Sequence, residues 1–141
     1  MSDASERVEL MNYEEYVDTA QRAGQAYEAG QHEEALAIFR TLVTSDISDL
    51  DKATTYRNMG VIEEEMGREQ DALSSYDRGV SYERMHGRIS VGEMKASYLY
   101  RLGRLAESLR EYEGLLLRPS LTEEEKNRLR HNVAAIRHEI G

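Results

Sequence analysis

The chain of 141 residues has the size of a single domain, and its composition excludes several classes of function. The absence of cysteine excludes a disulfide framework and thiolate zinc sites. The formal net charge of −9, from 18 Lys and Arg against 27 Asp and Glu, argues against nucleic acid as a partner, because an acidic surface repels phosphates.

Helices are favoured over strands, because the chain has one proline and is rich in Ala, Leu, Glu, Arg and Met. No apolar run approaches the roughly 20 residues of a membrane-spanning helix, so we expect no membrane insertion. The polar start MSDASERVEL lacks the basic-then-apolar pattern of a secretory signal, and we expect a cytoplasmic location. Residues 1–11 are predicted to form a flexible terminus.

Four positions carry the signature of a helix start. At each, a side chain that can accept hydrogen bonds from the first helical amides stands three residues before an acid. The four pairs are Asn12 with Glu15, Ser48 with Asp51, Ser90 with Glu93 and Thr122 with Glu125.

Expected helix ends are marked by glycine and proline. Gly30, Gly67 and Gly103 each follow an apolar-periodic stretch, where glycine can adopt the left-handed conformation that ends a helix. Gly87 and Pro119 close the helices that follow Gly67 and Gly103. Together these signals predict helices at 13–29, 32–45, 49–66, 69–85, 91–102, 105–117 and 122–139, with no room for a sheet.

The predicted helices form pairs that recur at a fixed interval. A turn glycine, a small residue and an aromatic residue share the same offsets in three copies, with 37 residues from Ala35 to Ala72 and 36 from Ala72 to Ser108. The small residue lets two antiparallel helices approach closely, and the aromatic residue fills the space between neighbouring pairs. The copies are Gly30-x4-Ala35-x3-Phe39, Gly67-x4-Ala72-x3-Tyr76 and Gly103-x4-Ser108-x3-Tyr112.

These residues resemble the tetratricopeptide repeat (TPR), whose pattern is W-x2-L-G-x2-Y followed by G, A-x3-F and P. The resemblance covers about residues 13–117 and implies an all-α superhelix, with three antiparallel helix pairs in 12–117 and a C-terminal capping helix in 118–141. The chain departs from the pattern at Glu63, where the family prefers an aromatic residue. The second repeat fits best, with Tyr56-x2-Met59-Gly60, then Gly67, Ala72, Tyr76 and Gly79.

The resemblance also implies a binding surface. In this family the first helix of each pair lines a concave groove, which holds an extended peptide or a helix of a partner protein. An alternative is that Tyr27 and Tyr100 pack between repeats while the charged residues form a solvated face. The predicted partner-binding residues are Tyr27, Arg57, Asn58, Val61, Glu64, Met94, Ser97, Tyr100 and Arg101.

One subclass of this family is not expected. Its carboxylate clamp grips the acidic C-terminal tails of heat-shock chaperones through converging Lys, Arg and Asn side chains. Asn58 matches one clamp position, but the other positions hold Ala20, Gly24, Ser90 and Met94, which cannot supply the charge-assisted hydrogen bonds. We therefore expect no binding of chaperone tails.

The sequence offers no catalytic or metal-binding motif. The four histidines lack partners at ligand spacing, and no phosphate-binding glycine loop, nucleophile elbow or H-E-x-x-H is present. We predict a non-catalytic interaction adaptor or scaffold without cofactor or metal. The first alternative is a self-associating module that forms a homodimer through the groove or the end near Tyr13, Tyr16 and Val17. An enzyme or a small-ligand receptor is the least favoured hypothesis.

Overall fold

The computed structural model describes residues 11–141, and this part of the chain contains seven α-helices, one short 3₁₀-helix and no strand. Every helix boundary lies within two residues of its prediction. The elements are α2 (Tyr13–Glu28), α3 (His32–Val43), α4 (Asp49–Glu65), α5 (Glu69–Glu83), η1 (Arg84–His86), α6 (Ser90–Arg101), α7 (Leu105–Leu116) and α8 (Glu123–Ile140).

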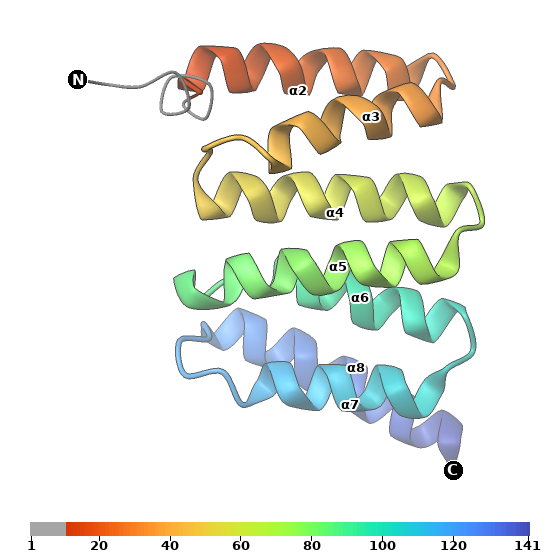
Figure 1. The fold of residues 1–141 in the computed structure, drawn as a ribbon. Coiled ribbons are helices and arrows are strands. Elements are labelled where there is room, and N and C mark those ends of the chain that lie inside the picture. The colour runs from red at the N-terminus through yellow and green to blue at the C-terminus, as the bar shows by residue number, and fades with distance from the viewer. Residues whose placement is uncertain (1–10) are drawn as a thin grey trace.

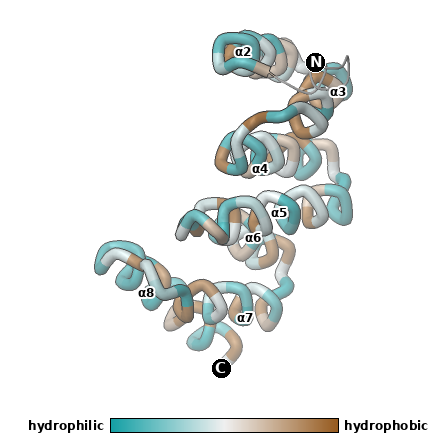
Figure 2. The backbone as a smooth tube through the Cα atoms, turned by 60° about the vertical axis from the view of Figure 1, so that its left-hand side comes forward, coloured by the Kyte–Doolittle hydropathy of each residue, from teal (hydrophilic) through white to brown (hydrophobic). Residues whose placement is uncertain are grey.

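The helices stack as antiparallel hairpins, and α2 and α8 lie at opposite ends of the stack (Figure 1). Helix α2 packs against α3, α4 against α5 and α6 against α7, while α8 packs against α7 as a last, unpaired helix. In the turned view α8 projects to the left of the helices above it (Figure 2). The predicted all-α superhelix with a terminal helix is confirmed.

Helices begin at all four predicted starts, and three of the four predicted side-chain caps are confirmed. The side chains of Asn12, Ser48 and Thr122 each accept a hydrogen bond from the amide three residues ahead, and Thr122 forms a complete capping box with Glu125. The cap prediction was wrong at Ser90, which is the first residue of α6 and does not cap the helix.

Helix α6 is capped instead by a carboxylate from the preceding helix. The oxygens of Glu83, the last residue of α5, accept hydrogen bonds from the amides of Val91 and Gly92 at 2.9–3.0 Å. Glu83 is buried, with 3% of its surface exposed. A negative charge at this place satisfies helix amides that otherwise have no partner.

The three turn glycines end helices as predicted. Gly30, Gly67 and Gly103 have φ values of +78°, +73° and +79°, which only glycine adopts without strain. In each turn the amide after the glycine bonds to a carbonyl five residues back, as from Gln31 to Ala26, an arrangement that satisfies the end of the helix.

The core consists of three apolar clusters that follow one another along the stack. The repeated small residues Ala35, Ala72 and Ser108 are completely buried. The hydroxyl of Ser108 donates to the Ala96 carbonyl at 2.7 Å, so this polar residue is satisfied inside a helix contact. The aromatic residues of the pattern, Phe39, Tyr76 and Tyr112, are buried as well.

Glu63, which stands where the TPR pattern has an aromatic residue, is buried and has a partner. It faces α5, where the Ser75 hydroxyl donates to its carboxylate. Burial raises the pKa of Glu63, while Arg40 and Arg68 act in the opposite direction. Ser75 therefore satisfies a carboxylate that the hairpin would otherwise bury without a hydrogen bond.

The predicted flexible terminus of residues 1–11 lies, apart from Met11, outside the described residues. Met11 is half-buried and packs against the first apolar cluster.

None of the helices in residues 11–141 combines the length and the apolar character needed to cross a membrane.

Candidate partner-binding groove

Three cavities follow one another along the face formed by the first helices of the hairpins, α2, α4 and α6, and by α8. One lies between α2 and α4, the next between α4 and α6, and the third between α6 and α8. We refer to this row of cavities as the groove. Some of the residues in its walls are predicted partner-binding residues, and others, such as Ile62 and Tyr112, are not.

The cavity between α2 and α4 is mostly apolar and has a volume of about 240 Å³. The buried Phe39 and Ile62 and the half-buried Val61 line it. Gly24 contributes open space, because a Cβ atom built there would meet nothing within 4 Å. The amide of Asn58 forms no hydrogen bond with a described side chain or backbone group, so it is available to a ligand.

The cavity between α4 and α6 is polar and has a volume of about 230 Å³. Arg57 from α4 and Arg88 from the segment before α6 line it, together with the hydroxyl residues Thr54 and Ser90. The capping carboxylate of Glu83 lies at its wall. Burial raises the pKa of Glu83, whereas the two amides of α6 and the nearby Arg118 and Arg57 oppose this shift.

The cavity between α6 and α8 is the largest of the three, at about 490 Å³. Met94 and Ser97 of α6 line it, and Ile89 and Tyr112 add apolar surface. Arg128 of α8 forms two hydrogen bonds of 2.8 Å to Glu93 of α6, which fixes the spacing of the two helices.

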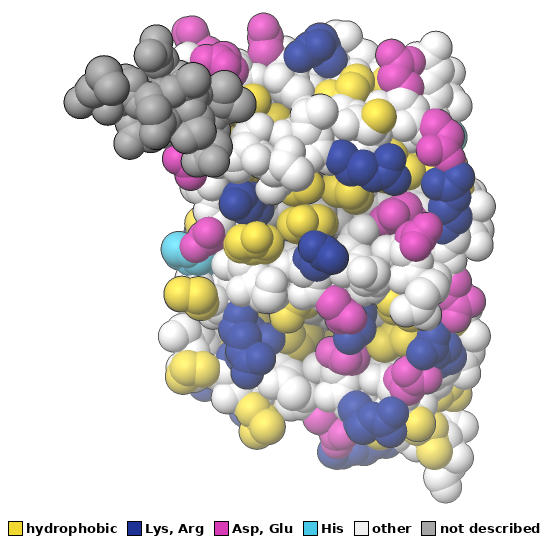
Figure 3. Space-filling model, viewed as in Figure 1, with side chains coloured by type: hydrophobic (Ala, Val, Ile, Leu, Met, Phe, Trp, Pro, Cys, Tyr) yellow, Lys and Arg dark blue, Asp and Glu magenta, His cyan; other side chains and the backbone are white. Residues whose placement is uncertain are grey.

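Beside the cavities, side-chain bridges join the C-terminal ends of successive groove helices. The Tyr27 hydroxyl donates to Glu65 at 2.7 Å, Arg101 donates to Glu64 at 2.7 Å, and Tyr100 donates to Glu139. We call these three contacts the rim bridges. They lie at the edge that carries the turns after Gly30, Gly67 and Gly103, where Figure 3 shows acidic and basic side chains next to one another.

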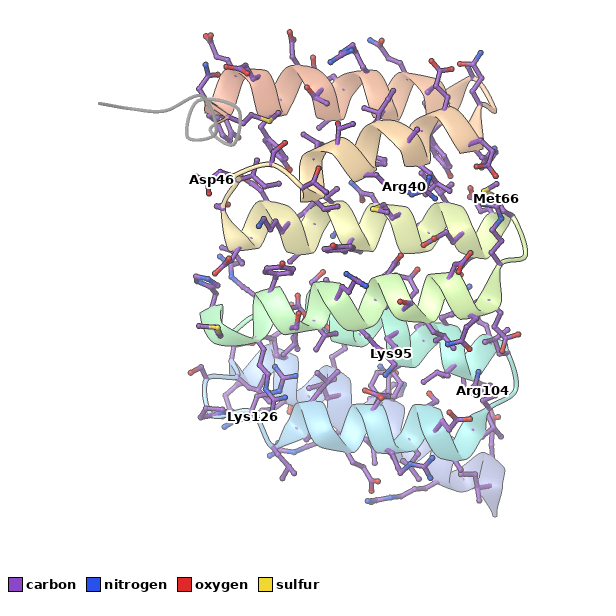
Figure 4. The ribbon with its side chains drawn as sticks, viewed as in Figure 1. Arg40, Asp46, Met66, Lys95, Arg104 and Lys126 are labelled. Atoms are coloured by element: carbon purple, nitrogen blue, oxygen red, sulfur yellow. The ribbon has the colours of Figure 1, made fainter. Side chains whose placement is uncertain are left out.

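The same edge carries further ion pairs between the second helices of the hairpins. Arg68 pairs with Glu33, and Arg104 pairs with Glu69 at 2.9 Å. Figure 4 shows Arg104 at this edge, and Lys95 deeper in the stack between α5 and α7. Lys95 bridges Asp77 and Glu111, with 2.7 Å to each carboxylate.

The structure divides the nine predicted partner-binding residues into two groups. Six line cavities, and Glu64, Tyr100 and Arg101 take part in the rim bridges. Tyr27 does both, because it lines the first cavity and also bonds to Glu65. The cavity-lining residues are Tyr27, Asn58 and Val61 in the first cavity, Arg57 in the second, and Met94 and Ser97 in the third.

Several residues that line the groove were missed from the sequence, and Phe39 and Arg88 are two of them. Phe39 belongs to the second helix of its hairpin, but its ring reaches the floor of the first cavity. Arg88 lies in the segment between η1 and α6 and lines both the second and the third cavities. A signal for Arg88 was present, because it follows the helix-ending Gly87 and lies two residues before the first residue of a groove helix.

Within residues 11–141, no three His, Asp or Glu side chains lie close enough together to hold a metal ion. His32 lies 3.5 Å from Glu65, and His86 lies 3.3 Å from Asp49. Each histidine thus contacts a single carboxylate; His32–Glu65 joins the first and second hairpins, and His86–Asp49 lies within the second.

No protein-family model matches the chain, and no curated protein matches its sequence. Solved structures with a similar fold do exist. PcrH, which is known from Pseudomonas aeruginosa, in complex with the chaperone-binding region of PopD has a TM-score of 0.69 at 19% identity, over 93% of this chain and 97% of PcrH.

Two further structures show the same likeness. The Yersinia enterocolitica type III secretion chaperone SycD, in complex with a peptide of the translocator YopD, has a TM-score of 0.69 at 20% identity, over 92% of this chain and 98% of SycD. The first TPR domain of Spaghetti (RPAP3), bound to the HSP90 peptide SRMEEVD, has a TM-score of 0.63 at 16% identity, over 89% of this chain and 98% of that domain. At such identities the likeness establishes the fold, a TPR-like all-α superhelix.

Proposed function

We propose that this chain is a non-catalytic, chaperone-like adaptor of the cytoplasm that binds an extended segment of a partner protein along the groove. The observation that carries the proposal is the row of three cavities between α2, α4, α6 and α8. An extended segment offers side chains at regular intervals, and successive cavities can each accept one of them. The free amide of Asn58 supplies a hydrogen-bonding group for the main chain of such a segment.

The similar structures support this proposal. PcrH and SycD are each solved with a segment of a translocator, and the Spaghetti domain is solved with an HSP90 peptide. The clamp positions of this chain hold Ala20, Gly24, Ser90 and Met94, so an acidic C-terminal tail is the less suitable ligand. We favour an internal segment that buries apolar side chains in the first and third cavities.

The proposal is tested with a substitution that places a larger side chain in the first cavity. In Gly24→Leu the new side chain enters space that is open in the wild type, so it competes with the ligand rather than with the core. Burying one apolar side chain contributes about 1.5–3 kcal/mol, so we expect affinity to fall roughly tenfold or more. The measurement is titration with peptides that the wild-type protein enriches from a displayed random library.

Gly114→Leu is the matched control. Gly114 is an exposed helical glycine in α7 with equally open space around it, and it lies away from the groove. Both variants should keep the wild-type circular dichroism. If the library yields no enriched peptides, or if the two variants bind them equally well, the groove is not the binding surface.

Self-association remains the alternative prediction. Of the three residues that suggested it, Tyr13 is 71% exposed, whereas Tyr16 and Val17 are half-buried. Tyr16 packs against the first apolar cluster. The exposed apolar surface at the start of α2 is therefore smaller than the sequence indicated.

A further inference from the structure

We propose that the cavity between α4 and α6 is a subsite for an acidic side chain, an Asp or Glu of the bound partner segment. This inference rests on the proposed function, since it names which residue of the segment the second cavity selects. Its basis is a set of unpaired donors that converge on one small cavity.

The cavity is lined by two guanidinium groups and two hydroxyl groups that have no partner in the described structure. Arg57, Arg88, Thr54 and Ser90 border the same 230 Å³ space, and none of their side chains forms a hydrogen bond or ion pair with a described residue. The other two arginines along the groove are neutralised, Arg101 by Glu64 and Arg128 by Glu93. Both arginines of the groove that lack an ion pair to a described residue thus line the second cavity, and Arg88 also reaches the third.

The one carboxylate in the cavity wall is already fully engaged. Glu83 accepts hydrogen bonds from the Val91 and Gly92 amides, and Arg118 as well as Arg57 lies near enough to influence its ionisation. Its negative charge is therefore shared among the α6 amides and two arginines. The Arg88 guanidinium forms no ion pair with a described residue, although Glu93 and Glu125 line the third cavity with it.

The chemistry of these donors fits a carboxylate. A guanidinium group presents parallel N–H donors that match the two oxygens of a carboxylate, and such charge-assisted hydrogen bonds are stronger than neutral ones. The net charge of −9 acts against acidic ligands in general. If the selected peptides prefer an acidic residue, that preference must therefore come from this cavity, because the net charge of the whole protein opposes it.

The site differs from the carboxylate clamp. Arg57 and Arg88 do not stand at the clamp positions, although Ser90 does. The apolar first cavity lies on the opposite flank of α4 from Arg57. Asn58 and Val61 of α4 face α2, whereas Arg57 faces α6. A helix with its side chains is about 10 Å across, and an extended segment rises about 3.3 Å per residue. The acidic residue should thus lie roughly three residues from an apolar one.

The test compares peptides enriched from one displayed random library by three proteins. These are the wild type, Arg88→Gln, and Arg78→Gln as a control that removes the same charge from the exposed face of α5. Arg78 is exposed, outside the groove and without an ion pair to a described residue. We expect the wild type and Arg78→Gln to enrich Asp or Glu at a fixed distance from an apolar residue, and Arg88→Gln to retain only the apolar preference.

A second measurement uses one synthetic peptide from the wild-type selection and its variants with Gln or phosphoserine at the acidic position. Wild-type affinity should fall about tenfold with Gln, as for loss of one hydrogen bond to a charged group, and Arg88→Gln should bind the Glu and Gln peptides equally. Equal acid frequencies in all three selections, or tight binding only with phosphoserine, would overturn the inference. Failure of the proposed function looks different, because then no peptide is enriched or Gly24→Leu leaves binding unchanged.

Discussion

Two buried carboxylates show how single residues shape this fold. Glu83 replaces a local cap at the start of α6, and Glu63 accepts a hydrogen bond from Ser75 inside the α4–α5 hairpin. Burial is the largest influence on both groups, and it raises the pKa of each above that of an exposed glutamate. Each group therefore links the stability of the fold to pH.

The sign of this link follows from the direction of the shift. A carboxyl with a raised pKa in the folded state binds a proton more readily there than in the unfolded chain. Its contribution to stability is fully present below the unfolded pKa and is lost as the pH rises through the folded pKa. At neutral pH the ionised Glu63 therefore costs stability that its neutral form does not cost.

Glu63→Gln removes this titration while keeping an acceptor for Ser75. We expect the variant to be more stable than the wild type at neutral pH, and the difference to shrink as the pH falls toward the ordinary pKa of glutamate. Urea denaturation at a series of pH values measures it. Glu34→Gln, an exposed residue of α3 without a described partner, controls for the lost charge. A constant difference across the series would show that Glu63 does not titrate differently in the folded state.

Among single residues, the sequence predicted which residues of the helices line the groove. It did not predict which charged groups would meet in one cavity. Arg57 and Asn58 follow from their place in the repeat, because a helix fixes which side a residue faces. The role of Arg88 depends on the path of the segment after η1, which the backbone of Glu83 helps to fix by accepting from the Arg88 amide at 3.3 Å. No periodic pattern encodes such a contact.

The close packing of the α4–α5 hairpin depends on a glycine of the repeat pattern, Gly60, at the contact between the two helices. A Cβ atom on Gly60 of α4 would lie 2.8 Å from Cδ1 of Tyr76 on α5, and closer still to Cε1. The Tyr76 hydroxyl also donates to Glu64, which ties the ring to the rim of the groove. Gly60 therefore allows both the close approach of α4 and α5 and the position of Tyr76.

Gly60→Ala tests this contact. Overpacking of a tight core site costs about 1–3 kcal/mol, so we expect the free energy of unfolding to fall by that amount in urea denaturation. Gly114→Ala is the counterpart, since its Cβ would meet nothing within 4 Å. It should raise stability by up to about 1 kcal/mol, because alanine favours a helix interior over glycine. A neutral Gly60→Ala would mean that the Tyr76 ring can move aside freely.

Helix positions were the most predictable part of this fold, for a physical reason. Glycine with a positive φ ends a helix almost irrespective of tertiary context, as Gly30, Gly67 and Gly103 show. Helix starts are less independent, because any acceptor in space can satisfy the first amides. Ser90 has the right spacing to Glu93, yet the carboxylate of Glu83 takes that role.

At the scale of the whole molecule, the last helix, α8, contributes buried residues to the core. Leu129, Val133 and Ile136 of α8 join Ile89, Ala96, Tyr112 and Leu115 in the third apolar cluster. In a repeat array each unit contacts mainly its neighbours, so the final hairpin has no other cover among the described residues. The sequence predicted this capping helix, whose polar outer face suits a terminal position.

Leu129→Ala tests how far the cap supports the array. Leu129 is completely buried, and loss of such a side chain costs about 2–5 kcal/mol. We expect a single unfolding transition at lower urea if the array unfolds as one unit, monitored by circular dichroism and tyrosine fluorescence together. Ile140→Ala, at a residue that is 51% exposed, should change little. Two separate transitions in Leu129→Ala would show that the third hairpin unfolds independently.

The rim bridges bear on the thermodynamics of recognition. Each joins the last turn of one groove helix to the last turn of the next, so the angle between successive hairpins is fixed before a partner arrives. A preorganised surface loses little conformational entropy on association, and the cost of ordering falls on the incoming segment. Under the proposed function, we expect the groove to keep its shape and the bound segment to adapt to it.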